Sequence, residues 1–358
     1  MSGTSLDGID AAIVETDGVD VAVPGPALGV PYDAQTRALL RAALSDAQTV
    51  AAGAPVPYSI RDAEKRLTEA HAEAVKALLH KARLAPSDIS LIGFHGQTIL
   101  HRPEQRWTCQ IGDGALLARL TGIDVVNDFR SADVKAGGQG APLVPLYHAA
   151  LLRKATAIVP PVVMVNIGGV ANVTYVSGDT VLAFDTGPGN APIDDWAHRH
   201  TGKPIDEGGA LARAGRVHDK ILLQMLDSQY FTRVPPKSLD RMDFGMDMVS
   251  GLGAEDGAAT LTAFTAAAIA RAREHFPEPA TTWIVCGGGR HNRTLMDQLR
   301  AHLNAPVLTA EDAGWDGDFI EAQAFAYLAV RSVRGLPLSL PTTTGVAQPM
   351  TGGKLHKK

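Results

Sequence analysis

An acidic residue at the end of an apolar run is the clearest candidate for chemistry in this chain of 358 residues. Asp185 follows the apolar residues 181–184, and Gly187-Pro188-Gly189 comes soon after it. The apolar run predicts a strand and Gly-Pro-Gly interrupts regular structure, so we expect Asp185 at a strand end. Glycines leave the backbone open there, which exposes one carboxylate to a small substrate. The alternative is that Asp185 caps a helix beginning near Ile193.

A second motif of small residues lies at the amino terminus. Residues 2–8 read Ser-Gly-Thr-Ser-Leu-Asp-Gly and lead into an apolar run at 9–15, which predicts a hairpin entering a strand. Small residues let N–H and hydroxyl groups approach phosphate oxygens, and Asp7 could hold a hydrated Mg²⁺ ion. The alternative is an ordinary tight turn. The candidate phosphate-binding residues are Gly3, Thr4, Ser5, Leu6, Asp7, Gly8, Ile9 and Asp10.

Two further glycine turns follow buried strands. Asn166, Gly168 and Gly169 lie in a strand–turn–strand pattern over 163–175 that is similar in kind to the first motif. A loop of three glycines, Gly287, Gly288 and Gly289, ends a strand and precedes a helix from about residue 293, an arrangement that lets a purine and ribose lie against the backbone. Neither a Walker A sequence nor a strand–GxGxxG–helix unit occurs, which disfavours P-loop and Rossmann enzymes.

The order of these motifs resembles the sugar kinase, Hsp70 and actin superfamily, where two glycine hairpins grip phosphates from both lobes of a cleft. More specifically, eight motifs spread from end to end of the chain resemble the anhydro-N-acetylmuramic acid kinase family. They are residues 2–8, 93–98, 110–113, 128–130, 137–143, 166–169, 184–190 and 341–345. Kinases of this kind usually carry an apolar strand before the first hairpin, so we expect the strand at 9–15 to lack an upstream partner.

The resemblance implies an α/β, two-lobed, actin-like ATPase fold (RNase H-like) with an interdomain nucleotide cleft that closes on ATP. Residues 1–127 with about 326–358 would form the first lobe, which carries the phosphate hairpin and a C-terminal return helix. Residues 128–325 would form the second lobe, which carries the second hairpin, Asp185 and the adenosine-side glycine loop. ATP and Mg²⁺ are the implied cofactors, and a cytoplasmic homodimer is the implied assembly.

The implied substrate is 1,6-anhydro-N-acetylmuramic acid, whose O6 is already bonded to its own C1. We expect Asp185 to deprotonate a water that attacks C1, while the released O6 attacks the γ-phosphorus of ATP. The phosphoryl group captures the leaving oxygen, so one carboxylate suffices. Two other functions stay open. One is a superfamily kinase acting on another sugar with a free hydroxyl, and the other is a non-catalytic nucleotide sensor.

The lactyl carboxylate of that sugar needs a cation, and Arg130 is the candidate because its motif follows a strand end. A surface salt bridge from Arg130 to Asp128 or Asp133 is the alternative. Glu321 is interpreted as a solvated helical residue and stays outside the catalytic set.

Three more residues are expected at the sugar. His95 and Gln97 are predicted to line the sugar side, although His95 could equally be a hydrogen-bonded core residue. Asn190, together with Asp194, could orient the water or the sugar hydroxyls, and a helix cap is the alternative for Asp194.

Composition agrees with a cytoplasmic enzyme of two domains, because 358 residues with 45% hydrophobic content can bury two cores. The net charge of −5 and the lack of a long basic run argue against nucleic-acid binding. Cys109 and Cys286 are interpreted as reduced core residues. The sequence shows neither a signal peptide nor a membrane-spanning segment.

Apolar periodicity predicts the elements that must position these residues. Helices are expected over 34–51, 60–84, 258–275 and 318–333, the last one returning the chain to the first lobe. Strands are expected at 91–95, 108–111 and 124–127, and three more over 162–185. The glycine-rich residues 137–142 suit a domain crossing or a substrate loop.

Overall fold

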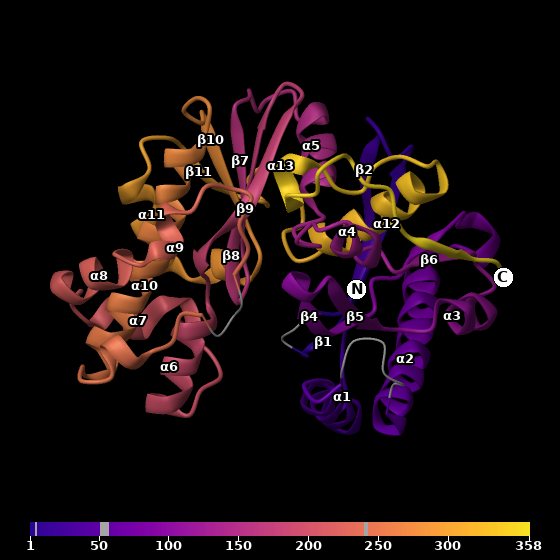
Figure 1. The fold of residues 1–358 in the computed structure, drawn as a ribbon, viewed down its shortest axis with the longest axis horizontal. Coiled ribbons are helices and arrows are strands. Elements are labelled where there is room, and N and C mark those ends of the chain that lie inside the picture. The colour runs from indigo at the N-terminus through magenta and orange to yellow at the C-terminus, as the bar shows by residue number, and fades with distance from the viewer. Residues whose placement is uncertain (4–5, 51–56, 240–242) are drawn as a thin grey trace. The chain divides into compact units, whose positions relative to one another are not determined.

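The computed structural model describes residues 1–3, 6–50, 57–239 and 243–358, so Thr4 and Ser5 of the amino-terminal motif lie outside the described residues. The chain forms two compact units, Met1–Lys154 with Phe319–Lys358, and Ala155–Asp318 (Figure 1). Helices and strands mix in both units, which confirms the predicted α/β class. The divisions differ from the sequence-based boundaries at 127 and 325, because residues 128–154 and 319–325 belong to the first unit. The Tyr147 hydroxyl, for example, donates to Gln323 Oε1 inside that unit.

The first unit combines small sheets with long helices. Its strands are β1 (Gly8–Thr16), β2 (Ala22–Pro31), β3 (Ile92–Gly93), β4 (Gln97–Arg102), β5 (Trp107–Ile111), β6 (Val125–Asn127) and β12 (Lys354–His356). Its helices are α1 (Ala34–Ala47), α2 (Tyr58–Ala82), α3 (Gly114–Thr121), α4 (Ser131–Lys135), α5 (Pro145–Lys154), α12 (Ile320–Val333) and α13 (Pro341–Thr344). β1 pairs with β2, β4 pairs with β5, and β6 lies between β3 and β12. Figure 1 shows the yellow C-terminal strand beside β6.

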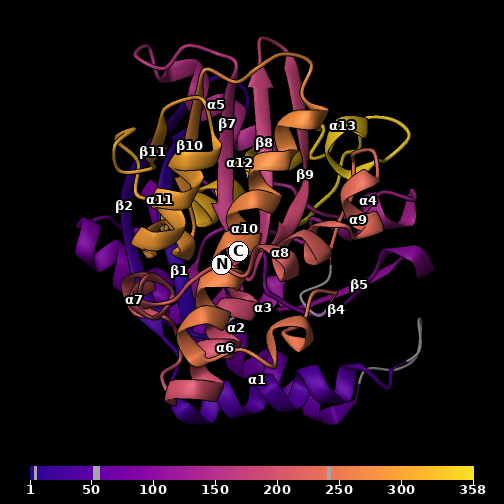
Figure 2. The ribbon, with the colours of Figure 1, turned by 90° about the vertical axis from the view of Figure 1, so that its left-hand side faces the viewer.

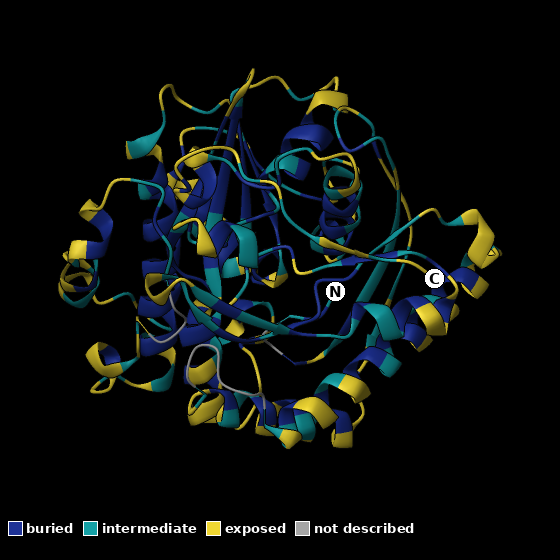
Figure 3. Ribbon diagram, turned by 45° about the vertical axis from the view of Figure 1, so that its right-hand side comes forward, coloured by how far each residue is buried: buried dark blue, intermediate teal, exposed yellow. Residues whose placement is uncertain are grey.

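Helix α2 forms because apolar residues recur along one face, as the sequence predicts. Ile60, Ala63, Leu67, Ala74 and Leu78 are buried on this face, whereas the opposite face, at residues 61–62, 65–66 and 76–77, is exposed (Figure 3). β1 pairs antiparallel with the following strand β2, and upstream only Ser2 makes an isolated bridge to Ile9 among the described residues.

The second unit is built on one sheet in the order β11-β10-β7-β8-β9. The strands are β7 (Val162–Ile167), β8 (Val170–Ser177), β9 (Thr180–Pro188), β10 (Thr282–Cys286) and β11 (Val307–Thr309). The helices are α6 (Ala191–Thr201), α7 (Ala210–Ala214), α8 (Asp219–Leu226), α9 (Gln229–Thr232), α10 (Ala254–Arg271) and α11 (Arg293–His302). β7, β8 and β9 run antiparallel as the predicted three strands, and β10 and β11 add in parallel to β7.

Helix α10 crosses the face of this sheet (Figure 2). All its residues from 257 to 270 are buried, which explains why its sequence is apolar and small on every side. The single turn η5 (Ala272–His275) continues the chain from α10, so the predicted helix over 258–275 begins earlier and ends as a 3₁₀ turn.

The expectation that Asp185 ends its strand is wrong, because β9 continues through Pro188. The register shifts between the Ala171–Gly187 and Asn172–Asp185 pairs, which leaves Thr186 as the extra residue of a β-bulge. β9 is also the edge of the sheet, where a proline costs no ladder hydrogen bond. The bulge therefore absorbs the irregular residues, and bulges commonly redirect side chains next to active sites.

The glycine-rich residues 137–142 lie inside the first unit and are held by Asp133. One oxygen of this buried carboxylate accepts from the Gly140 N–H at 2.6 Å. Its other oxygen accepts from the hydroxyls of Ser339 and Thr344. Asp133 thus joins α4, the glycine-rich loop and the C-terminal residues 339–344.

Asp133→Asn is expected to lower the free energy of unfolding by about 1–3 kcal/mol, because an amide nitrogen then faces a donor in a buried site. Urea denaturation measures the change. Asp62→Asn on the exposed side of α2 is the matched control, with an expected effect within about 0.5 kcal/mol. Equal stability of the two variants would contradict the structural role of Asp133.

Candidate active site

Asp185 lies on the edge strand β9, with its backbone and carboxylate both held by residues 230–239. The Asp185 N–H donates to the Lys237 carbonyl at 3.0 Å, and the Tyr230 hydroxyl donates to the Asp185 carbonyl at 2.6 Å. The carboxylate oxygen Oδ2 accepts from the Leu239 N–H at 2.8 Å. Helix α6 has Asn190 as its N-cap, so the helix-cap interpretation of Asp185 is wrong.

The pKa of the Asp185 carboxylate is raised toward neutral pH. Burial raises its pKa to about 7, against the opposing effect of the Leu239 N–H. A carboxylate with a pKa near 7 exchanges a proton readily at neutral pH, as a general base requires. Neither Tyr230 nor the Lys237–Leu239 segment is signalled by the sequence, because their contacts with β9 depend on the tertiary fold.

The second glycine motif and the glycine loop meet in the same unit as Asp185. The Asn190 N–H donates to the Gly168 carbonyl at 2.7 Å, and the Asn190 amide donates to the Ile167 carbonyl at 3.3 Å. A side chain added at Gly287 would meet Asn166 Oδ1 at 2.3 Å. The second glycine motif therefore lies beside the loop at 287–289, and the residues brought together are Asn166, Gly168, Gly169 and Asn190. Asp194 lies one turn into α6 and does not cap it.

The glycines of this group divide into two kinds. Gly287 has a φ of 75°, and a Cβ at Gly289 would lie 2.3 Å from Ile167 Cγ2, so conformation and packing require these two glycines. A Cβ at Gly168, Gly169 or Gly288 would meet nothing nearer than 3.6 Å, and none of the three has a left-handed φ. These three glycines leave room beside the backbone that the protein itself does not fill.

The amino-terminal motif is described in part. Asp7 is exposed, and its Oδ1 accepts from the Gly8 N–H at 2.9 Å. Arg37 Nε donates to the Leu6 carbonyl at 3.0 Å, and Leu6 has a φ of 55°. A Cβ at Gly8 would lie 2.5 Å from the Val30 carbonyl oxygen, so packing against β2 requires this glycine. Gly3 precedes these residues, and Ile9 and Asp10 belong to β1.

Arg130, His95 and Glu321 interact in the first unit, where His95 is buried and the other two are half-buried. Arg130 Nε donates to His95 Nε2 at 2.9 Å, and Arg130 Nη1 donates to the Gly140 carbonyl at 2.7 Å. The described residues show no ion pair from Arg130 to Asp128 or Asp133, so the surface salt-bridge interpretation is wrong.

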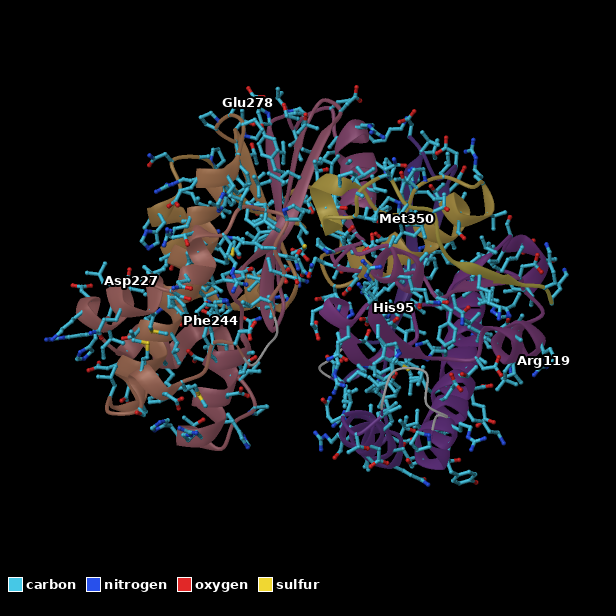
Figure 4. The ribbon with its side chains drawn as sticks, viewed as in Figure 1. His95, Arg119, Asp227, Phe244, Glu278 and Met350 are labelled. Carbon is cyan, nitrogen blue, oxygen red and sulfur yellow. The ribbon has the colours of Figure 1, made fainter. Side chains whose placement is uncertain are left out.

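His95 (labelled in Figure 4) is the buried, hydrogen-bonded histidine of the alternative interpretation. Burial, and then the charge of Arg130, lower the pKa of His95 well below its ordinary value. Since Nε2 accepts from Arg130, the neutral ring carries its proton on Nδ1, which lies 2.9 Å from the Gly96 carbonyl. The ring also packs against Phe325, with centroids 4.5 Å apart.

Glu321 was expected to be solvated, and that expectation is wrong. It lies in the first turn of α12, half-buried, where burial raises its pKa and the charge of Arg130 opposes the rise. Residue type alone does not signal this, because a glutamate is usually exposed.

Gln97 has no solvent exposure, and its amide donates to the Thr98 carbonyl at 3.3 Å. Its Oε1 atom has no hydrogen-bond partner among the residues that the structure describes. Buried acceptors are normally satisfied, so this oxygen is suited to a donor from a bound ligand or water.

Two further features predicted from the sequence concern the cysteines and the hydrophobicity of the helices. Cys109 and Cys286 form no disulfide in the described part of the chain. Cys286 is buried, as predicted for a core residue, whereas Cys109 is half-buried. No helix in the described part of the chain has both the length and the hydrophobicity needed to cross a bilayer.

The solved structures that match this chain are distant from it in both sequence and structure. The activator of the 2-hydroxyisocaproyl-CoA dehydratase from Clostridium difficile, with bound ADPNP, has a TM-score of 0.43 and 11% identity over 93% of each chain. A ROK family glucokinase from Streptomyces griseus, in complex with glucose and AMPPNP, has a TM-score of 0.38 and 13% identity over 91% of this chain and 97% of its own.

Sequence relatives are much nearer. Anhydro-N-acetylmuramic acid kinases from Methylobacterium nodulans and Rhodospirillum rubrum are 53% and 54% identical to this chain. The alignments cover 99% of this chain in both cases, with 97% of the first relative and 92% of the second. The family model described as anhydro-N-acetylmuramic acid kinase matches residues 1–358. The chain therefore belongs to the anhydro-N-acetylmuramic acid kinase family.

Proposed function

We propose that the protein converts 1,6-anhydro-N-acetylmuramic acid, water and ATP into N-acetylmuramic acid 6-phosphate and ADP. The water oxygen bonds to C1 as the C1–O6 bond breaks, and O6 bonds to the γ-phosphorus as the bond to the ADP oxygen breaks. One water proton passes to Asp185 and then to solvent. The family membership supports the substrate, and the Asp185 carboxylate is the observation that carries the mechanism.

Asp185 is assigned the role of general base. Its carboxylate lies on a strand edge, and a pKa of about 7 makes it a stronger base than an ordinary aspartate while a large share stays ionised at neutral pH. Tyr230 and Leu239 hold its backbone carbonyl and carboxylate, so the base is oriented before substrate binds.

The phosphates of ATP are assigned to the open glycines. Gly168, Gly169 and Gly288 have space where a side chain would stand, which suits close approach of phosphate oxygens to the backbone. No hydrogen bond within the described residues uses the Gly169 N–H, so this donor is suited to phosphate. The amino-terminal residues 3–10 are assigned to phosphate as well, on the resemblance.

Asp7 is assigned to hydrated Mg²⁺. Mg²⁺ is commonly held by one or two carboxylates, waters and substrate phosphates, and the exposed carboxylate of Asp7 could serve as such a ligand. When bound, the ion would neutralise charge on the transferring phosphoryl group.

The sugar is assigned to Arg130, Gln97 and Asn190. His95 is assigned to the same side, where both of its ring nitrogens are used within the protein and it orients Arg130. Arg130 uses Nε and Nη1 within the protein, so Nη2 is the donor for the lactyl carboxylate. The unpaired Oε1 of Gln97 is suited to a sugar hydroxyl. The cytoplasmic location and the homodimer are proposed on the resemblance alone.

Asp185→Asn is expected to lower kcat by at least about 100-fold, because the amide cannot accept the water proton. ATP binding, measured by calorimetry, is expected to stay unchanged. Asp179→Asn, at the exposed β8–β9 turn of the same hairpin, is the matched control and should keep wild-type turnover. Near-wild-type activity of Asp185→Asn would refute the assignment of the base.

The pH profile of kcat/KM for the sugar, at saturating Mg-ATP, is expected to show an acid limb near pH 7. The base must be ionised to act, so activity falls as pH drops below the Asp185 pKa and reaches a plateau above it. A limb near pH 4, the range of an ordinary aspartate, would contradict the burial of this carboxylate.

Turnover in ¹⁸O-labelled water is expected to place one label in the C1 hydroxyl of the 6-phosphate product, as read by mass spectrometry. The labelled oxygen comes from the attacking water, whereas O6 keeps the sugar's own oxygen. Release of ADP with an unlabelled sugar phosphate would indicate a kinase acting on a free hydroxyl. ATP binding without ADP release would indicate a nucleotide sensor.

A further inference from the structure

Lys237 is a buried cation that the proposed reaction does not use. Its side chain is only 8% exposed, although lysine is rarely buried unless it is paired. Nζ donates to the carbonyls of Tyr230 at 3.2 Å and Phe231 at 3.5 Å, and lies 3.4 Å from His275 Nε2. The ammonium also lies 4.9 Å from the ring centroid of Tyr230 and 5.7 Å from that of Phe184.

The backbone around Lys237 runs along the free edge of β9. The Lys237 carbonyl accepts from the Asp185 N–H, and two residues later the Leu239 N–H donates to the Asp185 carboxylate. Successive side chains of a strand point to opposite faces, so Phe184 and Asp185 face opposite sides of β9. Lys237 contacts Phe184, and it is therefore on the side away from the carboxylate.

Lys237 also binds a firmly packed support. Its two acceptor carbonyls belong to helix α9, whose aromatic residues Tyr230 and Phe231 pack against Phe244 with centroids 6.0 and 5.6 Å apart. Phe244 (labelled in Figure 4) packs in turn on Phe264 of α10, at 5.4 Å. The lysine thus ties the chain before Leu239 to the helix whose Tyr230 hydroxyl holds the Asp185 carbonyl.

We propose that Lys237 is a positioning residue for the catalytic base: its ammonium fixes residues 237–239 on α9, so that the Leu239 N–H meets the Asp185 carboxylate. The inference rests on the proposed function of Asp185. It assigns Lys237 no contact with substrate, and its effect on the reaction passes through the backbone of residues 237–239.

The predicted signature is a change in proton affinity at Asp185. The Leu239 N–H lowers the Asp185 pKa against the effect of burial, so loss of this hydrogen bond would raise it further. Tyr230 is the titratable group that faces both Lys237 and Asp185. The other charged or titratable groups around Lys237 are Arg233, Arg271, Glu274 and His275.

Lys237→Met tests the proposal in the full chain with Mg-ATP and 1,6-anhydro-N-acetylmuramic acid. The acid limb of kcat/KM is expected to move up by about one pH unit, which corresponds to about a tenfold loss of activity below the limb. The KM for ATP should not change. Lys220→Met, on the exposed surface of α8, is the matched control and should keep the wild-type profile.

A merely structural lysine would lower activity by the same factor at every pH and leave the acid limb in place, which would overturn the proposal. Hydrogen exchange gives a second reading, since the Leu239 amide should exchange faster in Lys237→Met. Lys237→Leu also lacks a donor to the α9 carbonyls, and it replaces the Met variant if circular dichroism shows the latter to be unfolded. An unmoved limb in folded Lys237→Leu would overturn the proposal equally.

The two failures are distinguishable. Wild-type turnover by Asp185→Asn would show that Asp185 is not the general base. That result would refute the proposed role of Asp185 together with this inference. An inactive Asp185→Asn beside an unmoved acid limb in Lys237→Met would refute the inference alone.

Discussion

The burial of one carboxylate on an edge strand is the constraint on which the second unit depends. Removing the Asp185 carboxylate from water raises its pKa, and this opposes the ionised form that its proposed role as a general base needs. The backbone N–H of Leu239 offsets part of that effect. The donor lies outside the sheet, so the fold must bring a separate segment to the edge of β9, and α9 together with the aromatic residues around it provides the surface for that segment.

In the first unit, the group whose charged form is disfavoured by burial is a cation, Arg130. Burial lowers the pKa of Arg130, while the charges of Glu321 and Asp133 oppose the decrease. Neutral His95 accepts from its Nε atom, and the Gly140 carbonyl accepts from Nη1. Asp133 does not pair with Arg130, and instead fixes the loop that presents this carbonyl. The guanidinium is thus oriented by neutral acceptors, which leaves its charge available for the anionic ligand proposed above.

Periodic elements could be read from the sequence, because their signal is local. The apolar stripe of α2 and the small apolar residues of α10 gave helices close to those observed. The continuation of β9 could not be read, since Gly187 and Pro188 look like a break until the bulge and the sheet edge are known. The prediction that Glu321 is exposed was wrong for a related reason. A helical glutamate is usually exposed, and only the tertiary fold brings Arg130 near it. The glycine motifs identified the family, but sequence alone could not separate glycines required by packing from those beside open space.

The contact between β9 and α10 has a consequence for natural variation in this protein. A Cβ added at Gly187 would lie 2.9 Å from the Cβ of Ala268. The strand and the helix therefore approach so closely that only the one methyl group of Ala268 fits between them. Asp185 is two residues before Gly187 on the same strand. One extra carbon at either position would press on the strand that carries the base, from the side of the core. Loss of activity can therefore arise from a substitution that never reaches the ligand, and a survey of inactive alleles confined to polar residues would overlook it.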